Sequence, residues 1–408
     1  MTIAELMDKK IAIVGAGANN RGLMGYLKAN QIAFDVIEWK NIEELTGKLD
    51  VYQIIFRTPS LPYLSKPIQQ ALQNGAIVYS QTKLFFDNCP AKIIGVTGTK
   101  GKGTTSSLIG KILQLTGRKV WLAGNMGQDP FEFIDQIKSN DLVVMELSSF
   151  QLQDLEKSPH ISVVLSISPD HLDHHKDMDE YLKAKSSILA FQKKEDFAIV
   201  HPMLPTWFKN LGLGQKILIV PSSVSDYSRK LLGEHNLENI SAAVEVGKLE
   251  QVSIDVIRKA VAEFEPLPHR LQIVEKKNGI TFVDDSISTN EEAAIAAIHS
   301  FNQPLIVILG GSTKGLDYSN LAATIKHSKH VKAAIVVGQV ADQIVKSLTG
   351  WTGKILTGAK DMKEILDQAV SVASSGDVVI LSPAAASFDM FKNYKDRGEQ
   401  FIQLVKQL

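Results

Sequence analysis

The sequence is dominated by short, continuous apolar runs that alternate with glycine-containing turns and amphipathic stretches. Clear examples are KIIGV from Lys92, LVVMEL from Leu142, PLIVILGG from Pro304 and DVVILSP from Asp377. Apolar runs without polar alternation are typical of strands that are buried on both faces, as in parallel sheets covered by helices. The sequence therefore predicts an α/β fold built from doubly wound parallel sheets.

The strongest local signal is a glycine-rich turn between one such run and a predicted helix from Thr104 to about Thr116. Small residues let consecutive backbone N–H groups converge on a phosphate at a helix N-terminus, and Lys102 can reach its outer oxygens. Gly103 stands where a P-loop usually has the Ser or Thr that holds Mg²⁺, so this hydroxyl must come from Thr104, Thr105 or water. The predicted phosphate contacts are Gly98, Thr99, Lys100, Gly101, Lys102, Gly103, Thr104 and Thr105.

The chain length and a proline-containing segment predict how the chain divides into domains. At roughly 150 residues per domain, 408 residues predict two to three domains. We expect a small Rossmann-like domain at 1–90, a central P-loop ATPase-type parallel-sheet domain at 91–265 and a Rossmann-like C-terminal domain at 266–408. The segment EPLPHR (265–270) carries two prolines between helical and strand-like stretches, and we expect it to be the linker into the third domain.

Charge and cysteine content exclude several classes of protein. Lys plus Arg and Asp plus Glu both number 44, so no global basic field exists to attract nucleic acid or anionic lipid. The single cysteine excludes an internal disulfide and a Cys-rich zinc site, which fits a reducing compartment. No run approaches the roughly 18 apolar residues of a membrane-spanning helix, and the N-terminus is not a signal peptide. We expect a cytoplasmic monomer that binds small molecules.

Acidic and imidazole groups follow two further predicted strands. Glu146 closes LVVMEL, and SPDHLDHH (168–175) follows the run SVVLSI. The carboxyl ends of parallel strands line the crevice in which such sheets bind ligands. Carboxylate and imidazole can both hold Mg²⁺ when phosphates supply the remaining ligands. A helix cap at Glu146 and a polar surface loop at 168–175 are the alternative interpretations.

A lysine occupies the apolar face of the next predicted helix. In DEYLKAKSSILAF, Lys185 follows Tyr181 by four residues and precedes Ile188 by three, so the three side chains share one face. An inward lysine either extends its ammonium group to solvent along the protein surface or takes part in chemistry.

Further polar clusters lie in the later part of the chain. HNLEN (235–239) opens a predicted helix, where its amides either contact an adenine or ribose or cap the helix. DDSISTN (284–290), GGSTK (310–314) and SPAAAS (382–387) each follow an apolar strand. Several strands of one sheet that present Lys, Ser and Thr at their carboxyl ends describe an anion pocket.

Taken in order, these motifs resemble the Mur ligase family from about residue 91 to the end of the chain. The most specific segments are ELSSFQL, SPDHLDHH with AKSSI, LPHR, DDSISTN and LSPAAASFDMFKNYKDRGEQF. The resemblance implies a three-domain enzyme that uses ATP to phosphorylate a carboxylate, after which an amine attacks the acyl phosphate. The last segment is similar to the member that adds D-glutamate to UDP-N-acetylmuramoyl-L-alanine (UDP-MurNAc-L-Ala) in peptidoglycan precursor synthesis.

The resemblance also implies roles for residues at matching positions. The implied catalytic residues are Lys102, His171 and Lys185, and the implied Mg²⁺ ligands are Thr104, Glu146, His171 and Lys185. Lys185 matches a lysine that the family carbamylates, which turns a cation into a carboxylate-like ligand. The implied adenine and ribose contacts are Asn236, Asn239, Arg270 and Asp285. Asn125 matches a residue near the muramoyl group, and the implied D-glutamate contacts are Thr289, Lys314, Ser387 and Tyr394.

Four features depart from the family's pattern. Gly103 replaces a usual Ser or Thr, Ile287 replaces a lysine, the stretch 192–232 is short, and the first domain matches the uridine-binding pattern loosely. Two other functions therefore stay open at this point. Folylpolyglutamate synthetases also have glycine at the position of Gly103, so a related folate ligase is one. A nucleotide-binding protein without catalysis is the other.

Overall fold

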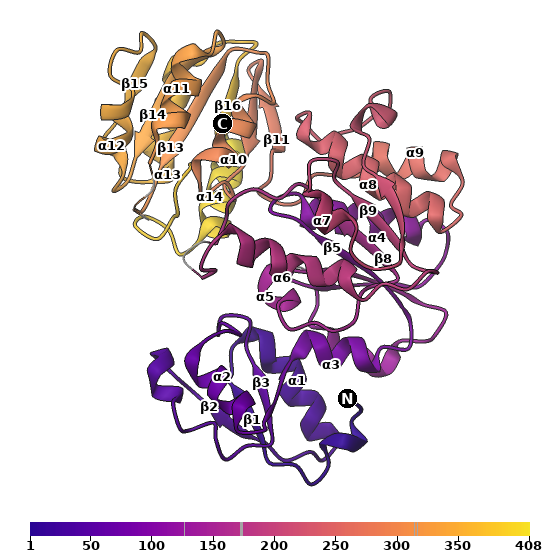
Figure 1. Ribbon diagram of the computed structural model, residues 1–408. Coiled ribbons are helices and arrows are strands. Elements are labelled where there is room, and N and C mark those ends of the chain that lie inside the picture. The colour runs from indigo at the N-terminus through magenta and orange to yellow at the C-terminus, as the bar shows by residue number, and fades with distance from the viewer. Residues whose placement is uncertain (126, 172–173, 314, 316) are drawn as a thin grey trace. The chain divides into compact units, whose positions relative to one another are not determined.

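The computed structural model describes residues 1–125, 127–171, 174–313, 315 and 317–408, and it has an α/β fold with three largely parallel sheets (Figure 1). The predicted fold class is confirmed. The chain forms two compact units, of which unit 1 holds the first two sheets and unit 2 holds the third. Unit 1 consists of Met1–Ser228 and Leu237–Glu263, and unit 2 of Arg229–Asn236 and Phe264–Leu408. The domain boundaries expected at residues 90 and 265 stay predictions.

The first sheet has four parallel strands in the order β2-β1-β3-β4. Its strands are β1 (Ile11–Val14), β2 (Asp35–Ile37), β3 (Ile54–Arg57) and β4 (Ile77–Ser80), with helices α1 (Ala18–Ala29), α2 (Lys66–Gln73) and α3 (Gln81–Asn88) and 3₁₀ turns Ala4–Leu6 and Ile42–Leu45. Alternate residues of a strand point to opposite faces. Accordingly, Ile11 and Ile13 enter one core cluster, while Ala12 and Val14 enter another.

The second sheet has six parallel strands in the order β10-β9-β8-β5-β7-β6, with β5 near its centre. Its strands are β5 (Lys92–Thr97), β6 (Val120–Gly124), β7 (Leu142–Glu146), β8 (Ile161–Val164), β9 (Phe197–Val200) and β10 (Gln215–Leu218). Its helices are α4 (Lys102–Gln114), α5 (Ser149–Leu152), α6 (Met178–Ala190), α7 (Thr206–Lys209), α8 (His235–Leu249) and α9 (Ile254–Glu263), with 3₁₀ turns Pro130–Glu132, Ile134–Gln136 and Pro221–Val224. Helix α4 begins two residues before the predicted start, directly after the left-handed Gly101.

The third sheet has six strands in the order β11-β12-β16-β13-β14-β15, and only β11 runs antiparallel to its neighbour. Its strands are β11 (Gln272–Lys277), β12 (Ile280–Asp284), β13 (Leu305–Gly310), β14 (Val331–Val337), β15 (Lys354–Leu356) and β16 (Val378–Leu381). Its helices are α10 (Glu291–Ile298), α11 (Ser319–His327), α12 (Ala341–Ser347), α13 (Met362–Val372) and α14 (Tyr394–Gln407). The carboxyl ends of β12, β13 and β16 therefore meet at one edge.

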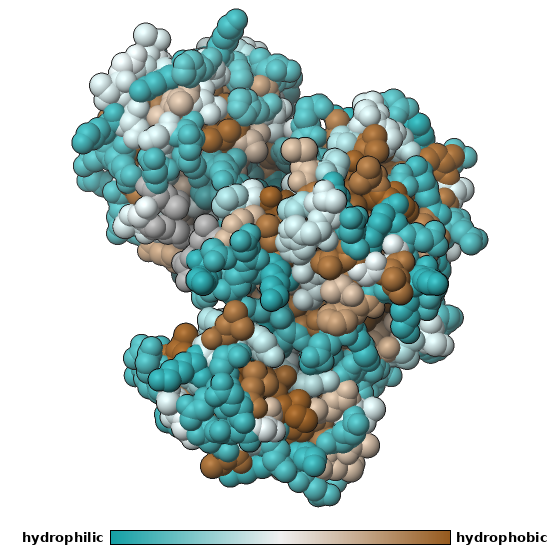
Figure 2. Space-filling view, in the orientation of Figure 1, coloured by the Kyte–Doolittle hydropathy of each residue, from teal (hydrophilic) through white to brown (hydrophobic). Residues whose placement is uncertain are grey.

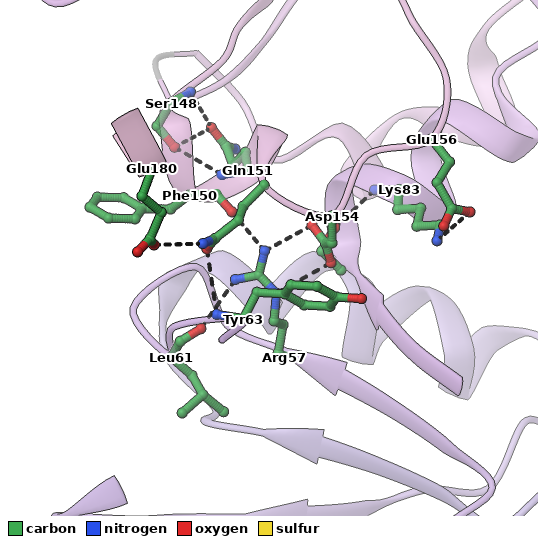
Figure 3. A network of polar contacts seen from close by, with 12 residues as sticks. Arg57, Leu61, Tyr63, Lys83, Ser148, Phe150, Gln151, Asp154, Glu156 and Glu180 are labelled. Atoms are coloured by element: carbon green, nitrogen blue, oxygen red, sulfur yellow. Dashed lines mark hydrogen bonds and ion pairs between the residues drawn. The ribbon is translucent and has the colours of Figure 1, made fainter. Parts of the chain in front are cut away.

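A buried ion pair links the first two sheets within unit 1 (Figure 3). Arg57, the last residue of β3, is fully buried, and its Nε and Nη2 donate to the two carboxylate oxygens of Asp154 at 3.2 and 2.8 Å. A second pair, Lys83 Nζ to Glu156 Oε2 at 2.8 Å, connects the same parts of the chain, but the Glu156 side chain is 70% exposed. The two pairs thus differ mainly in their access to water.

Within the described ranges, no helix combines the length and the apolar composition that crossing a membrane requires. On the face drawn in Figure 2, hydrophobic residues form separate groups among hydrophilic ones. Isolated exposed side chains such as Met203 and Leu213 are ordinary for globular proteins.

Replacing Asp154 with Ala should lower the free energy of unfolding by about 3–5 kcal/mol, because Arg57 would stay buried without a counter-charge. Urea denaturation followed by circular dichroism measures this loss. The matched control is Glu156→Ala, which removes the solvent-exposed partner of Lys83. This change should lower the free energy of unfolding by less than about 1 kcal/mol. Equal losses in the two variants would contradict the assignment of Arg57–Asp154 as a desolvated pair.

Candidate active site

The glycine-rich turn between β5 and α4 is closely packed. Gly98 and Gly101 have φ angles of +151° and +83°, which side chains rarely tolerate. A Cβ at Gly98 would lie 2.7 Å from the Leu165 Cβ, and one at Gly101 would overlap the Asn239 side chain. Helix α4 starts directly after this turn, so its first N–H groups and positive dipole end face the predicted phosphate position.

Two lysines converge on the same carbonyl of this turn. Lys102 Nζ donates to the carbonyl oxygens of Gly98 and Thr99 at 3.1 and 2.8 Å. Lys185 Nζ, from α6, donates to the Gly98 oxygen at 2.9 Å and lies 4.7 Å from the centre of the Tyr181 ring. The inward orientation predicted for Lys185 is correct, since it is 1% exposed. Burial, together with repulsion from Lys102, holds the pKa of Lys185 well below its usual range.

Thr99 ties the turn to the segment that follows β8. Its hydroxyl accepts a hydrogen bond from the Ser168 N–H and donates to the Ser168 carbonyl oxygen, both at 3.0 Å. The Tyr181 hydroxyl lies 3.2 Å from the same Thr99 oxygen. Burial raises the pKa of Tyr181 to about 12, so this hydroxyl stays protonated and can donate to Thr99. The turn, the start of the 168–175 segment and α6 thus form one polar cluster.

Glu146 is the last residue of β7, and only one oxygen of its buried carboxylate has a hydrogen-bond partner among the described residues. Its Oε1 accepts a hydrogen bond from Asn125 Nδ2 at 3.0 Å. Its Oε2 is inaccessible to solvent and has no hydrogen-bond partner among the described residues. A buried carboxylate oxygen without a partner costs free energy, which a cation or a cation-bound water would recover. Asn125, predicted to lie near the muramoyl substrate, is in direct contact with this group.

The histidines of the 168–175 segment gather around Phe150 of α5. The Phe150 ring is stacked on His175 at 5.2 Å between ring centres and meets His171 at 5.1 Å and His174 at 5.3 Å. His171 is exposed, has a left-handed φ of +54° and lies 3.7 Å from an Asp170 oxygen. His175 is buried and contacts Ser149 Oγ at 2.9 Å, and burial lowers its pKa.

Metal ligation by these residues stays a prediction. No group of three His, Cys, Asp or Glu side chains in the part of the chain that the structure describes could hold a metal ion by itself. The unpartnered Glu146 oxygen and the buried, easily deprotonated Lys185 do fit a cation whose remaining ligands come from phosphate and water. The predicted ligand Thr104 is buried in the first turn of α4.

A cavity of about 270 Å³ lies within unit 1, between parts of the chain that belong to the first and second sheets. Its described lining includes one cation, Arg21, two carboxylates, Asp129 and Glu132, and the amides of Gln81 and Gln151. Gly124 and Gly127, on either side of Asn125, also line it. This cavity has the size and polarity to receive part of a sugar or nucleotide.

In unit 2, Asp285 is the centre of a buried network after β12. Its Oδ1 accepts from the Leu271 N–H at 3.1 Å, and its Oδ2 accepts from the hydroxyls of Ser288 and Ser382 at 2.5 and 2.8 Å. Burial nevertheless raises the pKa of Asp285 to about 6, against the effect of these hydrogen bonds and of Arg270. The Arg270 Nε is buried and has no hydrogen-bond partner within the described structure.

One buried arginine of unit 2 holds the loops that carry two of the predicted amino-acid contacts, Thr289 and Ser387. Arg397 donates to the carbonyl oxygens of Ser286 and Ala385 at 2.9 and 3.1 Å, which fixes the loops that carry Thr289 and Ser387. Tyr394 begins α14, and its carbonyl oxygen accepts from the Ser286 hydroxyl at 2.8 Å. Lys314 lies outside the described residues, so its position is not part of this arrangement.

The predicted nucleoside contacts are divided between the two compact units. Asn239 Oδ1 accepts from the Thr105 hydroxyl at 3.1 Å, so it lies beside the glycine-rich turn of unit 1. Asn236 belongs to unit 2, where its Nδ2 donates to the Leu232 carbonyl at 2.6 Å. As predicted, α8 starts at His235, but its first two residues and the rest of the helix fall in different units.

Sequence reasoning missed three residues that organise these sites. Phe150 lies in ELSSFQL and Arg397 in LSPAAASFDMFKNYKDRGEQF, but these motifs do not indicate that Phe150 packs on the histidines or that Arg397 holds distant loops. Arg57 lies outside the motifs quoted above. The one available signal was the charge of Arg57 at the end of the apolar run IIF. A charged residue in such a position is buried only with a partner.

Together, the three sheets and the glycine-rich turn define a nucleotide-phosphate-binding α/β protein. Comparison with known families makes this more specific: a model of the Mur ligase middle domain matches residues 96–212, and a model described as "Mur ligase, glutamate ligase domain" matches residues 269–385. The chain belongs to the Mur ligase family. The predicted family is therefore confirmed.

Curated relatives match over nearly the whole chain. UDP-N-acetylmuramoylalanine–D-glutamate ligase of Acetivibrio thermocellus is 34% identical over 457 aligned positions, which cover 99% of this chain and 97% of the relative. The ligase of the same name from Symbiobacterium thermophilum is 32% identical and covers 98% and 99%. Because the first alignment is longer than this chain, the relative holds insertions that this chain lacks, in keeping with the compact segments noted above.

Solved structures share the fold at lower identity. The UDP-N-acetylmuramate-alanine ligase MurC of Thermotoga maritima has a TM-score of 0.61 at 17% identity and covers 98% of this chain and 99% of its own. MurF ligase from Thermotoga maritima, solved in complex with ADP, has a TM-score of 0.60 at 17% identity over 87% of this chain and 94% of its own. These similarities establish the shared architecture.

Replacing Gly101 with Ala should abolish measurable ADP binding, because the new methyl group would displace Asn239 and strain a left-handed turn. Isothermal titration calorimetry with ADP and Mg²⁺ measures this. Gly117→Ala is a matched control: Gly117 has nearly the same φ of +81°, but nothing lies within 4 Å of its Cβ position. ADP binding by Gly101→Ala with unchanged affinity would show that the close packing is dispensable.

The raised pKa of Asp285 predicts a specific pH dependence of stability. Its folded-state pKa of about 6 lies above its ordinary value of 3.8, so its contribution to the free energy of unfolding is complete below about pH 4 and is lost as the pH rises through about 6. The stability of the wild type minus that of Asp285→Asn should fall over this window, by roughly 3 kcal/mol. Denaturation curves at a series of pH values test this. A difference that does not vary with pH would mean that the carboxyl group is already ionised at pH 4.

Proposed function

We propose that this protein is an ATP-dependent ligase that joins D-glutamate to UDP-MurNAc-L-Ala in peptidoglycan precursor synthesis. The main support is the identity of 32–34% along almost the full chain with ligases of that name. The closely packed turn at 98–105 supports the proposal as well, because it leads into the N-terminus of α4 at the predicted phosphate contacts. ATP as co-substrate and a single, partly buried cysteine also support a cytoplasmic location.

The nucleotide would occupy the turn between β5 and α4. Lys102 now donates to carbonyl oxygens of the turn, and we infer that its ammonium group moves to the outer phosphate oxygens when ATP binds. Mg²⁺ bound with ATP supplies the charge neutralisation that lets a carboxylate approach the γ-phosphate. Glu146, His171 and Lys185 are the proposed residues around this ion, and the unpartnered Glu146 oxygen is the best-supported contact.

Lys185 has the chemistry that carbamylation requires. Burial favours its neutral amine, which is the form that attacks CO₂. A bond forms between Nζ and the carbon of CO₂, one C–O π bond opens onto oxygen, and one proton leaves the nitrogen, so the neutral amine becomes an anionic carbamate. The carbamate would then attract the Lys102 ammonium group, which shares the Gly98 carbonyl oxygen with Lys185.

The remaining residues would place the two substrates. The cavity beside Asn125 has amide and carboxylate groups for the UDP-sugar, with Arg21 as the cation in its described lining. The carboxylate of this substrate accepts the γ-phosphoryl group, and the D-glutamate amine then attacks the acyl carbon, loses a proton and displaces phosphate. We infer that Thr289, Ser387 and Tyr394 contact D-glutamate and that Arg270 and Asp285 contact the nucleoside, on the basis of their motif positions.

Phosphate release should require all substrates at once. With ATP and Mg²⁺ present, purified protein should release phosphate only when UDP-MurNAc-L-Ala and D-glutamate are added together, and mass spectrometry should detect the UDP-linked dipeptide. Each substrate alone, and L-glutamate in place of D-glutamate, are the controls. Release that depends instead on a folate and L-glutamate would support a folate ligase, and ADP binding without any turnover would support a non-catalytic role.

Removing the Lys185 amine should abolish turnover if its carbamate serves at the metal site. Lys185→Ala should lose on the order of 10³-fold or more in kcat, and short-chain carboxylic acids should restore part of it by replacing the carbamate. Lys183→Ala, an exposed lysine on the same helix, is the matched control and should keep normal activity. A fully active Lys185→Ala enzyme would limit Lys185 to a packing role.

A further inference from the structure

Arg57 does more than pair with Asp154. Its Nη2 also donates to the Phe150 carbonyl oxygen at 2.7 Å, and its Nη1 donates to the Leu61 carbonyl oxygen at 3.1 Å (Figure 3). Phe150 lies in α5, a single turn of helix whose last carbonyl groups have no partner within the helix. A residue from the first sheet therefore holds the carboxyl end of a helical turn that follows the second sheet.

The other end of α5 is also fixed. Ser148 and Gln151 form a reciprocal capping box, in which the Ser148 hydroxyl accepts the Gln151 N–H and the Gln151 side chain accepts the Ser148 N–H. Ser148 follows Glu146 by only two residues. With both ends fixed, the backbone of Phe150 has a defined position relative to the carboxylate that ends β7.

The Phe150 ring contacts the histidine rings, so its position affects theirs. Its ring is parallel to that of His175, with an interplanar angle of 1°, and meets the His171 ring at 64°. His175 is further held by Ser149 and by Glu180, which lies 3.3 Å from its Nδ1. His171 is exposed and has a left-handed backbone conformation. Its imidazole ring packs against the Phe150 ring.

We propose that Arg57 is a positioning residue for His171: its guanidinium group fixes Phe150, and the Phe150 ring fixes the orientation of the His171 imidazole. This inference rests on the proposed function, in which His171 acts beside the nucleotide. A planar guanidinium group can donate to a carboxylate and to two carbonyl oxygens at once, whereas a lysine ammonium group cannot reproduce that fork.

A purely structural role for Arg57 can be separated from a positioning role. The double variant Arg57→Met/Asp154→Leu replaces the buried ion pair with an apolar pair of similar size, which generally preserves stability. It removes the hydrogen bond to the Phe150 carbonyl in the same step. The control variant Lys83→Met/Glu156→Met removes the exposed ion pair between the same parts of the chain and leaves Phe150 untouched.

The first measurement is the ¹H–¹³C spectrum of the full-length protein labelled at histidine, with the His171 ring signal assigned by its loss in His171→Gln. We expect the His171 signal to move in the Arg57 double variant and to stay in place in the Lys83 double variant, because the ring current of Phe150 depends on its orientation. Phe150→Leu should move the same signal. This readout needs neither substrate nor metal, so it tests the positioning even where the proposed reaction fails.

The second measurement is steady-state kinetics with UDP-MurNAc-L-Ala, D-glutamate and ATP. The Arg57 double variant should lose on the order of 10- to 100-fold in kcat, with KM for D-glutamate unchanged, because a small displacement of a group near the reacting atoms lowers kcat. Adding Phe150→Leu should cause little additional loss, since both changes break the same connection. An unmoved His171 signal in the folded Arg57 double variant would overturn the proposal, whatever the value of kcat.

Discussion

The candidate site of unit 1 depends on one steric constraint: no side chain fits between the 98–101 turn and the residues that pack on it. Leu165 closes over Gly98, and Asn239 closes over Gly101. This close approach places the start of α4, the end of β8 and the α8 side chains around one point. It also leaves the Gly98 carbonyl as the common acceptor for Lys102 and Lys185. The backbone of the turn therefore sets both the shape and the charge of the site.

Charge is distributed around that turn in a way that favours an anion. Two lysine amino groups share one carbonyl oxygen, and burial together with repulsion from Lys102 disfavours the charged form of Lys185. One oxygen of the buried Glu146 carboxylate has no partner among the described residues, which favours a cation. A phosphate group accompanied by Mg²⁺ would satisfy both needs together, whereas either ion alone would satisfy one. The proposed metal-bound nucleotide would thus bring a cation to Glu146 and a phosphate group to the two lysines at the Gly98 carbonyl.

Two buried arginines connect parts of the chain that no local pattern relates. Arg57 links β3 to the segment after β7, and Arg397 links α14 to the loops after β12 and β16. Arg397 donates mainly to backbone carbonyl oxygens, whereas Arg57 divides its hydrogen bonds between the Asp154 carboxylate and two carbonyl oxygens. Both arginines therefore fix loop conformation. Burial of Arg397 lowers its pKa to about 10, which leaves it charged at neutral pH. Loops that carry polar residues need such support because they have no regular hydrogen-bond partners of their own.

The sequence by itself determined the class of fold, the strands that end in polar residues, the glycine-rich turn before α4 and the inward face of Lys185. These features depend on local periodicity and on the conformational limits of glycine, which a few neighbouring residues express. The ends of α4 differed by two residues because Gly101, rather than Thr104, closes the turn. Only the tertiary structure decided that Asn239 covers Gly101, that Glu146 keeps an unpartnered oxygen and that Arg57 reaches Phe150. Those contacts join residues up to 138 positions apart, and packing, not local pattern, selects which distant groups meet.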